Sequence, residues 1–293
     1  MKAKAIFSFF LSFFLLAIFH VFLVTVIYAE VPHRIISLAP NITEILFAMG
    51  LGDNIVGVTS FCDYPEKAKE KPKVGGMSNP SLEAILSLNP DIVVMTTDGN
   101  PKEIEERLRS LRIKTFVFKA RRLHELPDRI RDLGAALGVK SNSDTLAQEI
   151  ETAINRFAGK KQATSINNSS PISRQSTRKN KILFIVWPEP LIVAGRGTAI
   201  DDAITLLGGE NIASKAKISY PKYSIEEIIH QAPDVILIGK GHMNMNEVSR
   251  ELLKRIAIVP AVKNGAVFYV SDNLYRLGPR VIKGIEEIAE CLK

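Results

Sequence analysis

The stretch SLEAILSLNPDIVV, residues 81–94, is repeated 143 positions later as SIEEIIHQAPDVIL, residues 224–237. Five aligned pairs are identical, namely Ser81/Ser224, Glu83/Glu226, Ile85/Ile228, Pro90/Pro233 and Asp91/Asp234. Five further pairs exchange one aliphatic residue for another. A match at a fixed offset indicates internal repetition. Because two copies are found, the pattern favours two similar lobes over a solenoid.

Each copy predicts a helix, a tight turn and a strand. The serine can cap the helix, and the glutamate in the first turn complements the positive end of the helix dipole. Aliphatic residues at 82, 85 and 86 fit a helical stripe, and Pro90 ends it. The aliphatic run 92–95 that follows is typical of a strand buried on both faces, as in a parallel sheet.

Helical and strand patterns alternate along the rest of the chain, which predicts an α/β fold with parallel-rich sheets flanked by helices. We expect an N-terminal lobe at 30–139 and a C-terminal lobe at 181–293. A long amphipathic pattern midway between the repeats predicts one linking helix at 140–160. The segment 161–180 is rich in Ser, Asn, Gln and Lys, and is expected to be a polar loop.

Residues 1–29 resemble an export segment. Lys2 and Lys4 precede an apolar run that is long enough either for a cleaved signal peptide or for an N-terminal membrane anchor. Both alternatives place the remainder in the periplasm or otherwise outside the cytoplasm. The formal charge of the 293 residues is +7, but the basic residues are scattered, so we expect no nucleic-acid partner.

Two loops are candidate ligand sites. Residues 59–65 form a polar and aromatic loop after a predicted strand, at the carboxyl end where open α/β sheets bind ligands. The glycine loop 195–198 precedes a helix but lacks the Lys-Ser/Thr pair of a phosphate-binding loop. A turn with a helix cap is therefore favoured there. Cys62 and Cys291 fall in different lobes and are expected to be unpaired thiols.

Several of these stretches together resemble the periplasmic binding proteins of ABC importers for cobalamin and iron complexes, above all the cobalamin-binding members. The resemblance covers about residues 33–292 apart from 160–179. The stretches that carry it are RIISLAPNITEILFAMG, VGVTSFCDYP, AGRGTAIDDAITLLGGENIA and the two repeat copies.

The resemblance implies two α/β lobes joined by one long helix, with the ligand between them. It also implies a role for Glu83 and Glu226, because one exposed acid on each lobe of such proteins docks with arginines of the membrane permease. The alternative is that both glutamates only complement a helix dipole and recur through duplication.

The resemblance further suggests five ligand contacts. Aromatic residues on both lobes hold the corrin in the cobalamin-binding relatives, and Phe61 and Tyr220 match such positions. Met77 stands where an aromatic residue is usual, although methionine can also pack on a planar ligand. Trp187 is a candidate at a strand end, and Arg276 matches a basic position in the cleft wall.

We expect a solute-binding protein rather than an enzyme, with cobalamin or a related corrinoid as transported ligand, no cofactor and no metal site. An iron-siderophore or haem binder is the alternative, with Tyr64, Tyr220, Tyr275 or His242 as candidate iron ligands. An enzyme on a similar scaffold is disfavoured because no acid–base–nucleophile set is evident. Without a phosphate-binding loop, the energy for transport would come from the ATPase of the permease.

Overall fold

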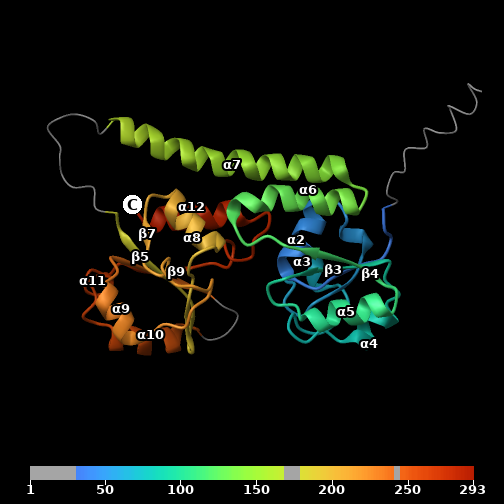
Figure 1. The fold of residues 1–293 in the computed structure, drawn as a ribbon, viewed down its shortest axis with the longest axis horizontal. Coiled ribbons are helices and arrows are strands. Elements are labelled where there is room, and N and C mark those ends of the chain that lie inside the picture. Colours follow the sequence, from blue (N-terminus) through green and yellow to red (C-terminus); the bar gives the residue numbers. More distant parts are fainter. Residues whose placement is uncertain (1–30, 168–178, 241–244) are drawn as a thin grey trace, which may run out of the picture.

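The computed structural model describes residues 31–167, 179–240 and 245–293. Two α/β lobes lie side by side, and one long helix runs along the same side of both (Figure 1). The export segment predicted at 1–29 lies outside the described residues. Within the described ranges, none of the helices combines the length and the apolarity that crossing a membrane requires.

The N-terminal lobe is built on a four-stranded, fully parallel sheet in the order β2-β1-β3-β4. Its strands are β1 (Ile35–Ser37), β2 (Ile55–Val58), β3 (Ile92–Thr96) and β4 (Lys114–Phe118). Its helices are α2 (Pro40–Ala48), η1 (Gly52–Asn54), α3 (Glu66–Lys69), α4 (Leu82–Ser87), α5 (Lys102–Ser110), η2 (Leu123–Glu125) and α6 (Leu126–Ala136).

The C-terminal lobe has a mixed sheet in the order β6-β5-β8-β9, with β7 paired to β5. Its strands are β5 (Lys181–Pro188), β6 (Leu191–Val193), β7 (Glu210–Asn211), β8 (Val235–Gly239) and β9 (Val267–Val270). Its helices are α8 (Ala199–Leu206), α9 (Ile225–Gln231), α10 (Met245–Arg255), α11 (Pro260–Lys263) and α12 (Val281–Cys291). Only the β5–β6 pairing is antiparallel in the described part of this sheet. The predicted two-lobed α/β class is therefore confirmed.

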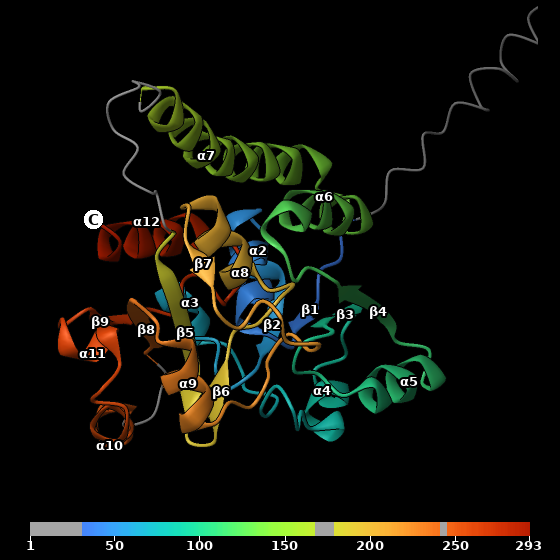
Figure 2. The same ribbon diagram turned by 60° about the vertical axis from the view of Figure 1, so that its left-hand side comes forward.

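Helix α7 (Lys140–Asn167) is the predicted linking helix. It packs on α6 of the N-terminal lobe and on α8 and α12 of the C-terminal lobe, and Figures 1 and 2 both show it along one side of the molecule. It continues seven residues past the predicted end at 160, so the loop predicted at 161–180 is wrong for 161–167. The sequence there, KQATSIN, begins with good helix formers and contains no proline, which allows the helix to continue.

The two repeats have the same local structure. The hydroxyls of Ser81 and Ser224 cap α4 and α9 by accepting hydrogen bonds from the backbone N–H of Ala84 and Glu227, at 3.2 and 3.1 Å. All residues of β3 and β8 are buried, which confirms the predicted buried strands.

The repeated aspartates bind the first strand of each lobe. The Asp91 carboxylate accepts hydrogen bonds from the backbone N–H of His33 and of Arg34, both at 2.9 Å. The Asp234 carboxylate accepts one from Lys181 N–H at 2.9 Å. Each repeat therefore supplies a helix, a central strand of the sheet and the side chain that fixes the start of the first strand of its lobe.

Candidate ligand-binding cleft

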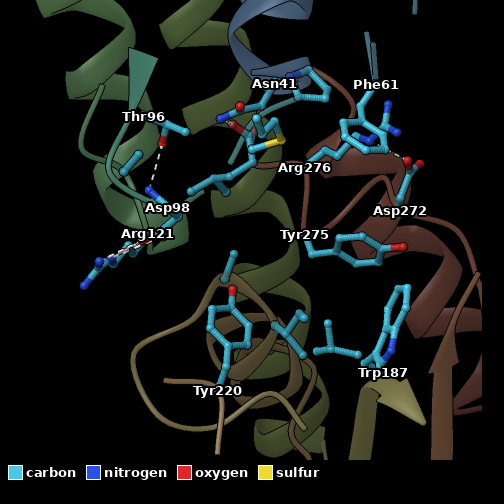
Figure 3. A pocket seen from close by; sticks show the side chains of 17 residues that line it. Asn41, Phe61, Thr96, Asp98, Arg121, Trp187, Tyr220, Asp272, Tyr275 and Arg276 are labelled. Atoms are coloured by element: carbon cyan, nitrogen blue, oxygen red, sulfur yellow. Dashed lines mark hydrogen bonds and ion pairs between the residues drawn. The ribbon is translucent and has the colours of Figure 1, made fainter. Parts of the chain in front are cut away.

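A cavity of about 530 Å³ lies between the lobes (Figure 3). All five predicted ligand contacts line it, with Phe61 and Met77 on the N-terminal lobe and Trp187, Tyr220 and Arg276 on the C-terminal lobe. The other lining residues are Pro40, Asn41, Thr96, Asp98, Ala120, Arg121, Val186, Ala199, Ile200, Asp272, Tyr275 and Leu277. Whether the five residues contact a ligand stays a prediction.

The carboxyl ends of both sheets form the walls of the cavity. Phe61 follows β2, Asp98 follows β3 and Arg121 follows β4, while Trp187 lies at the end of β5 and Asp272 follows β9. Ligands of open α/β sheets bind at this edge because the loops there are free to carry functional side chains. The parallel strands thus bring residues that are distant in the sequence to one cleft.

The loop that carries Met77 is fixed by Asn100. The Asn100 side-chain amide donates hydrogen bonds to the carbonyl oxygens of Met77 and Leu38, each at 2.9 Å. Its carbonyl oxygen accepts one from the Thr96 N–H at 2.8 Å. Met77 is therefore held over the cleft although it belongs to a loop.

Two tyrosines face the cavity from the C-terminal lobe. The Tyr275 hydroxyl donates a hydrogen bond to the Lys240 carbonyl at 3.1 Å, and its ring packs edge-on against Phe184. Figure 3 shows the Tyr220 hydroxyl directed toward Asp98 and Arg121. Burial raises the pKa of both phenols to about 12, with Asp98 adding to the shift of Tyr220 and Asp272 to that of Tyr275. Both therefore stay protonated near neutral pH.

The charged groups of the lining form two ion pairs. Arg121 binds Asp98, with Nη2 2.7 Å and Nε 2.8 Å from Oδ1. Arg276 binds Asp272 through Nε at 2.5 Å. Figure 3 shows the pairs on opposite walls of the cavity. The predicted basic residue Arg276 therefore lines the cavity with its charge already engaged by a carboxylate.

The Arg276 pair continues into a partly buried network that joins the lobes. Arg276 Nη1 lies 2.5 Å from Asp63 and 3.9 Å from Glu44, which both belong to the N-terminal lobe. Arg280 makes a bidentate pair with Glu44, at 2.6 and 2.9 Å. The Glu44 side chain is 1% exposed, and this burial raises its pKa although Arg280 and Arg276 oppose the shift.

Two other contacts complete the junction. The guanidinium of Arg280 lies 4.6 Å from the centre of the Tyr64 ring, so this tyrosine covers the network and is absent from the described lining of the cavity. On the other side of the cleft, Arg122 binds Asp202 of α8 through Nη2 at 2.5 Å. Ionic contacts therefore connect the lobes at two separate places.

Asp98 and Arg121 are functional candidates that the sequence analysis missed. A usable signal was present, because each follows a predicted strand at its carboxyl end, as Phe61 does. Asn41 lies in the first turn of α2, which begins at Pro40 with Ala39 in the cap position, so it is not the residue that caps this helix. Its amide instead donates to the Leu277 carbonyl across the lobes at 3.3 Å.

The other sequence expectations have mixed outcomes. The loop 195–198 is a turn with a cap, since the Thr198 hydroxyl accepts a hydrogen bond from Asp201 N–H. Cys62 is buried beside Thr43 and Thr59, and Cys291 lies in α12. His242 lies outside the described residues. Within the described ranges, no three His, Cys, Asp or Glu side chains are grouped to hold a metal ion.

The repeated glutamates are exposed on α4 and α9, one on each lobe. Figure 1 shows both helices on the side of the molecule opposite α7. Glu226 accepts hydrogen bonds from its own backbone N–H and from the Ser224 hydroxyl, which lower its pKa and keep it ionised. The surface therefore offers one carboxylate per lobe on a shared side.

Two α/β lobes joined by a packed helix, with a ligand-sized cleft at their sheet edges, define a two-lobed binding protein. A sequence model of the periplasmic binding protein family matches residues 35–274, and the chain belongs to this family. Such proteins bind substrates for transport.

Relatives and solved structures resemble the chain over most of its length. A vitamin B12-binding protein of Vibrio campbellii is 30% identical over 261 residues, which is 88% of each chain. The periplasmic heme-binding protein RhuT from Roseiflexus sp. RS-1 is 30% identical, with a TM-score of 0.76 over 88% of this chain and 97% of that one. The vitamin B12-binding protein BtuF of Vibrio cholerae is 27% identical, with a TM-score of 0.73 over 89% and 96%.

Proposed function

We propose that this protein captures cobalamin or a related corrinoid between its lobes and delivers it to an ABC importer. The observation that carries the proposal is the lining of the cleft. Phe61 and Met77 face Trp187 and Tyr220 across a cavity of about 530 Å³. Flat and polarisable side chains on opposite walls suit a large planar macrocycle.

The similarity to vitamin B12-binding proteins supports the same ligand, and the site chemistry agrees with it. The described lining contains no histidine or cysteine. Haem or an iron-siderophore complex is the second candidate. The heme-binding protein RhuT has the same fold, and its sequence identity to this chain is 30%, as is that of the vitamin B12-binding protein of Vibrio campbellii.

Delivery would use Glu83 and Glu226 to dock on a permease, with one acid held by each lobe. Charge complementarity of this kind steers encounter and fixes the orientation of a partner. A separate ATPase would supply the energy, and the chain itself would catalyse no reaction. Membership of the periplasmic binding protein family supports a location outside the cytoplasm, with residues 1–29 as signal peptide or membrane anchor.

Trp187 provides a direct test, because the sequence contains one tryptophan. Corrins absorb visible and near-ultraviolet light, so a bound corrinoid should quench the fluorescence of a tryptophan beside it. We expect cyanocobalamin to quench Trp187 saturably, and Phe61→Ala to weaken binding about tenfold through the loss of one packed aromatic ring. Tyr269→Phe on β9, outside the described lining, is the control. Quenching without saturation would refute the proposal.

A further inference from the structure

The cleft contains cations, but its described lining holds no guanidinium without a carboxylate partner. Arg121 is bound to Asp98, and Arg276 is bound to both Asp272 and Asp63. Directly behind the lining, Arg280 is engaged by Glu44 and covered by Tyr64. Four carboxyl groups and three guanidiniums thus surround this space, so no excess of positive charge is available to an incoming anion.

This arrangement matters because an ionised carboxylate is an acceptor only, and leaves water at a high free-energy cost unless a donor or a cation receives it. To bind Arg121, a ligand carboxylate would have to displace Asp98 and leave that group without its partner. To bind Arg276, it would compete with Asp272 and Asp63 in a position where the arginine side chain is 9% exposed. Breaking the pairs of the buried Arg276 is strongly unfavourable. The Arg121–Asp98 pair is more exposed, at 54% and 38%, so displacing Asp98 costs less but still leaves a second carboxylate beside the incoming one.

An uncharged amide on a ligand does not have to break either ion pair. Its N–H groups can donate to the carboxylate oxygens of Asp98 and Asp272 while both ion pairs stay intact, and hydrogen bonds to a charged acceptor are the stronger kind. Asn41 adds a neutral polar group to the same lining. The walls therefore complement a macrocycle whose rim carries amides.

We infer, on the basis of the proposed function, that the paired arginines make the cleft select its macrocycle by charge. Corrinoids with uncharged amide substituents are accepted, and tetrapyrroles with ionised carboxylates are disfavoured. Asp98 is the specificity-determining residue on the N-terminal wall, because it decides whether Arg121 is available to a ligand anion.

Cyanocobalamin and its monocarboxylic acids, in which one peripheral amide has been hydrolysed, form a matched pair of ligands. They share corrin, cobalt and lower ligand and differ by one charge at the rim. Equilibrium dialysis of the purified protein at pH 7.5 should give at least tenfold weaker binding for the monocarboxylic acids. Equal affinities for the amide and the acids would overturn the inference and leave the proposed function standing.

Two substitutions should change the ratio of the affinities for cyanocobalamin and its monocarboxylic acids in opposite directions. Asp98→Asn frees Arg121, so the preference for amide over acid should fall at least fivefold. Arg121→Gln leaves Asp98 unpaired, so the preference should rise. Asp128→Asn on α6 makes the same charge change on an exposed surface and should leave the ratio unchanged. Because general misfolding would weaken both ligands alike, a ratio that stays constant in both cleft variants contradicts the inference.

A wrong assignment of the ligand would give a different result from a wrong inference about charge. If neither corrinoid binds, the corrinoid proposal is wrong, and charge selection is then measured with haem and its dimethyl ester. Tighter binding of the ester supports selection against carboxylates. Tighter binding of haem overturns it.

Discussion

Ala232 and Asn89 occupy equivalent positions of the two repeats, and both have a left-handed backbone, with φ of 49° and 42°. Each lies between the end of a helix and a proline. Asparagine tolerates this conformation, whereas the Cβ of alanine is strained in it. The second repeat is therefore strained at Ala232, whereas Asn89 at the same position of the first repeat is less strained.

We expect Ala232→Gly to raise the free energy of unfolding by about 1 kcal/mol, because glycine has no Cβ to strain. Ala153→Gly, within the regular helix α7, should lower it by about 1 kcal/mol. Urea unfolding at pH 7 measures both. A destabilising effect of the same size at position 232 would show that the left-handed conformation carries no strain.

The raised pKa values of Tyr220 and Tyr275 predict how stability changes at alkaline pH. Burial raises both pKa values from 10 to about 12. Because unfolded tyrosines lose their protons first, stability from these groups is intact below about pH 10 and is lost progressively toward pH 12. Absorbance at 295 nm should show Tyr220 and Tyr275 among the late-ionising tyrosines, and Tyr220→Phe and Tyr275→Phe should each remove one. Ionisation of both near pH 10 would contradict the raised pKa values.

At the scale of elements, the repeat is where the sequence predicted most. Ser81, Asp91 and their counterparts are local signals, because a cap and a turn depend on neighbouring residues alone. The end of α7 was missed for a related reason. The polar composition of 161–167 is typical of a loop, but lysine, glutamine and alanine also favour a helix when no proline or cap ends it.

Both caps predict measurable stability. Ser81→Ala and Ser224→Ala should each lower the free energy of unfolding by about 1 kcal/mol, since a backbone N–H in the first turn loses its partner. Asparagine at either position should retain most of the stability. Urea unfolding checks the four variants, and unchanged stability of the alanine variants would show that the caps contribute nothing.

At the scale of the molecule, the two lobes are joined by groups that no local pattern reveals. The predicted cleft contacts came from resemblance and from the carboxyl ends of strands, and all five line the cavity. Pairing of Arg276 with Asp63, more than 200 residues away, depends on tertiary packing. The sequence therefore located the cleft, but it could not show that the arginines are neutralised.

We expect Arg280→Met to destabilise the protein by about 3 kcal/mol, because it leaves the buried Glu44 carboxylate without its main partner. The double variant Glu44→Gln/Arg280→Met should recover much of this loss, since no unpaired charge remains. Arg129→Met, which breaks an exposed pair with Asp132 on α6, should change stability by less than about 1 kcal/mol. An Arg280→Met effect as small as this control would mean that the junction is not held by the network.

Docking through both lobes predicts a separation of binding from delivery. Glu83→Lys/Glu226→Lys should leave cyanocobalamin affinity unchanged and reduce uptake by cells to the level without the protein. Glu149→Lys/Glu290→Lys makes the same charge change on α7 and α12 and should support normal uptake. Normal uptake by the first variant would refute docking through these glutamates.

Calorimetric titration of the purified protein with cyanocobalamin, followed by haem on a second sample, tests the central claim most directly. We expect one cyanocobalamin per chain, with heat that disappears when Phe61 and Trp187 are both replaced by alanine, and much weaker binding of haem. No heat with cyanocobalamin, together with tight binding of haem, would contradict a corrinoid cleft.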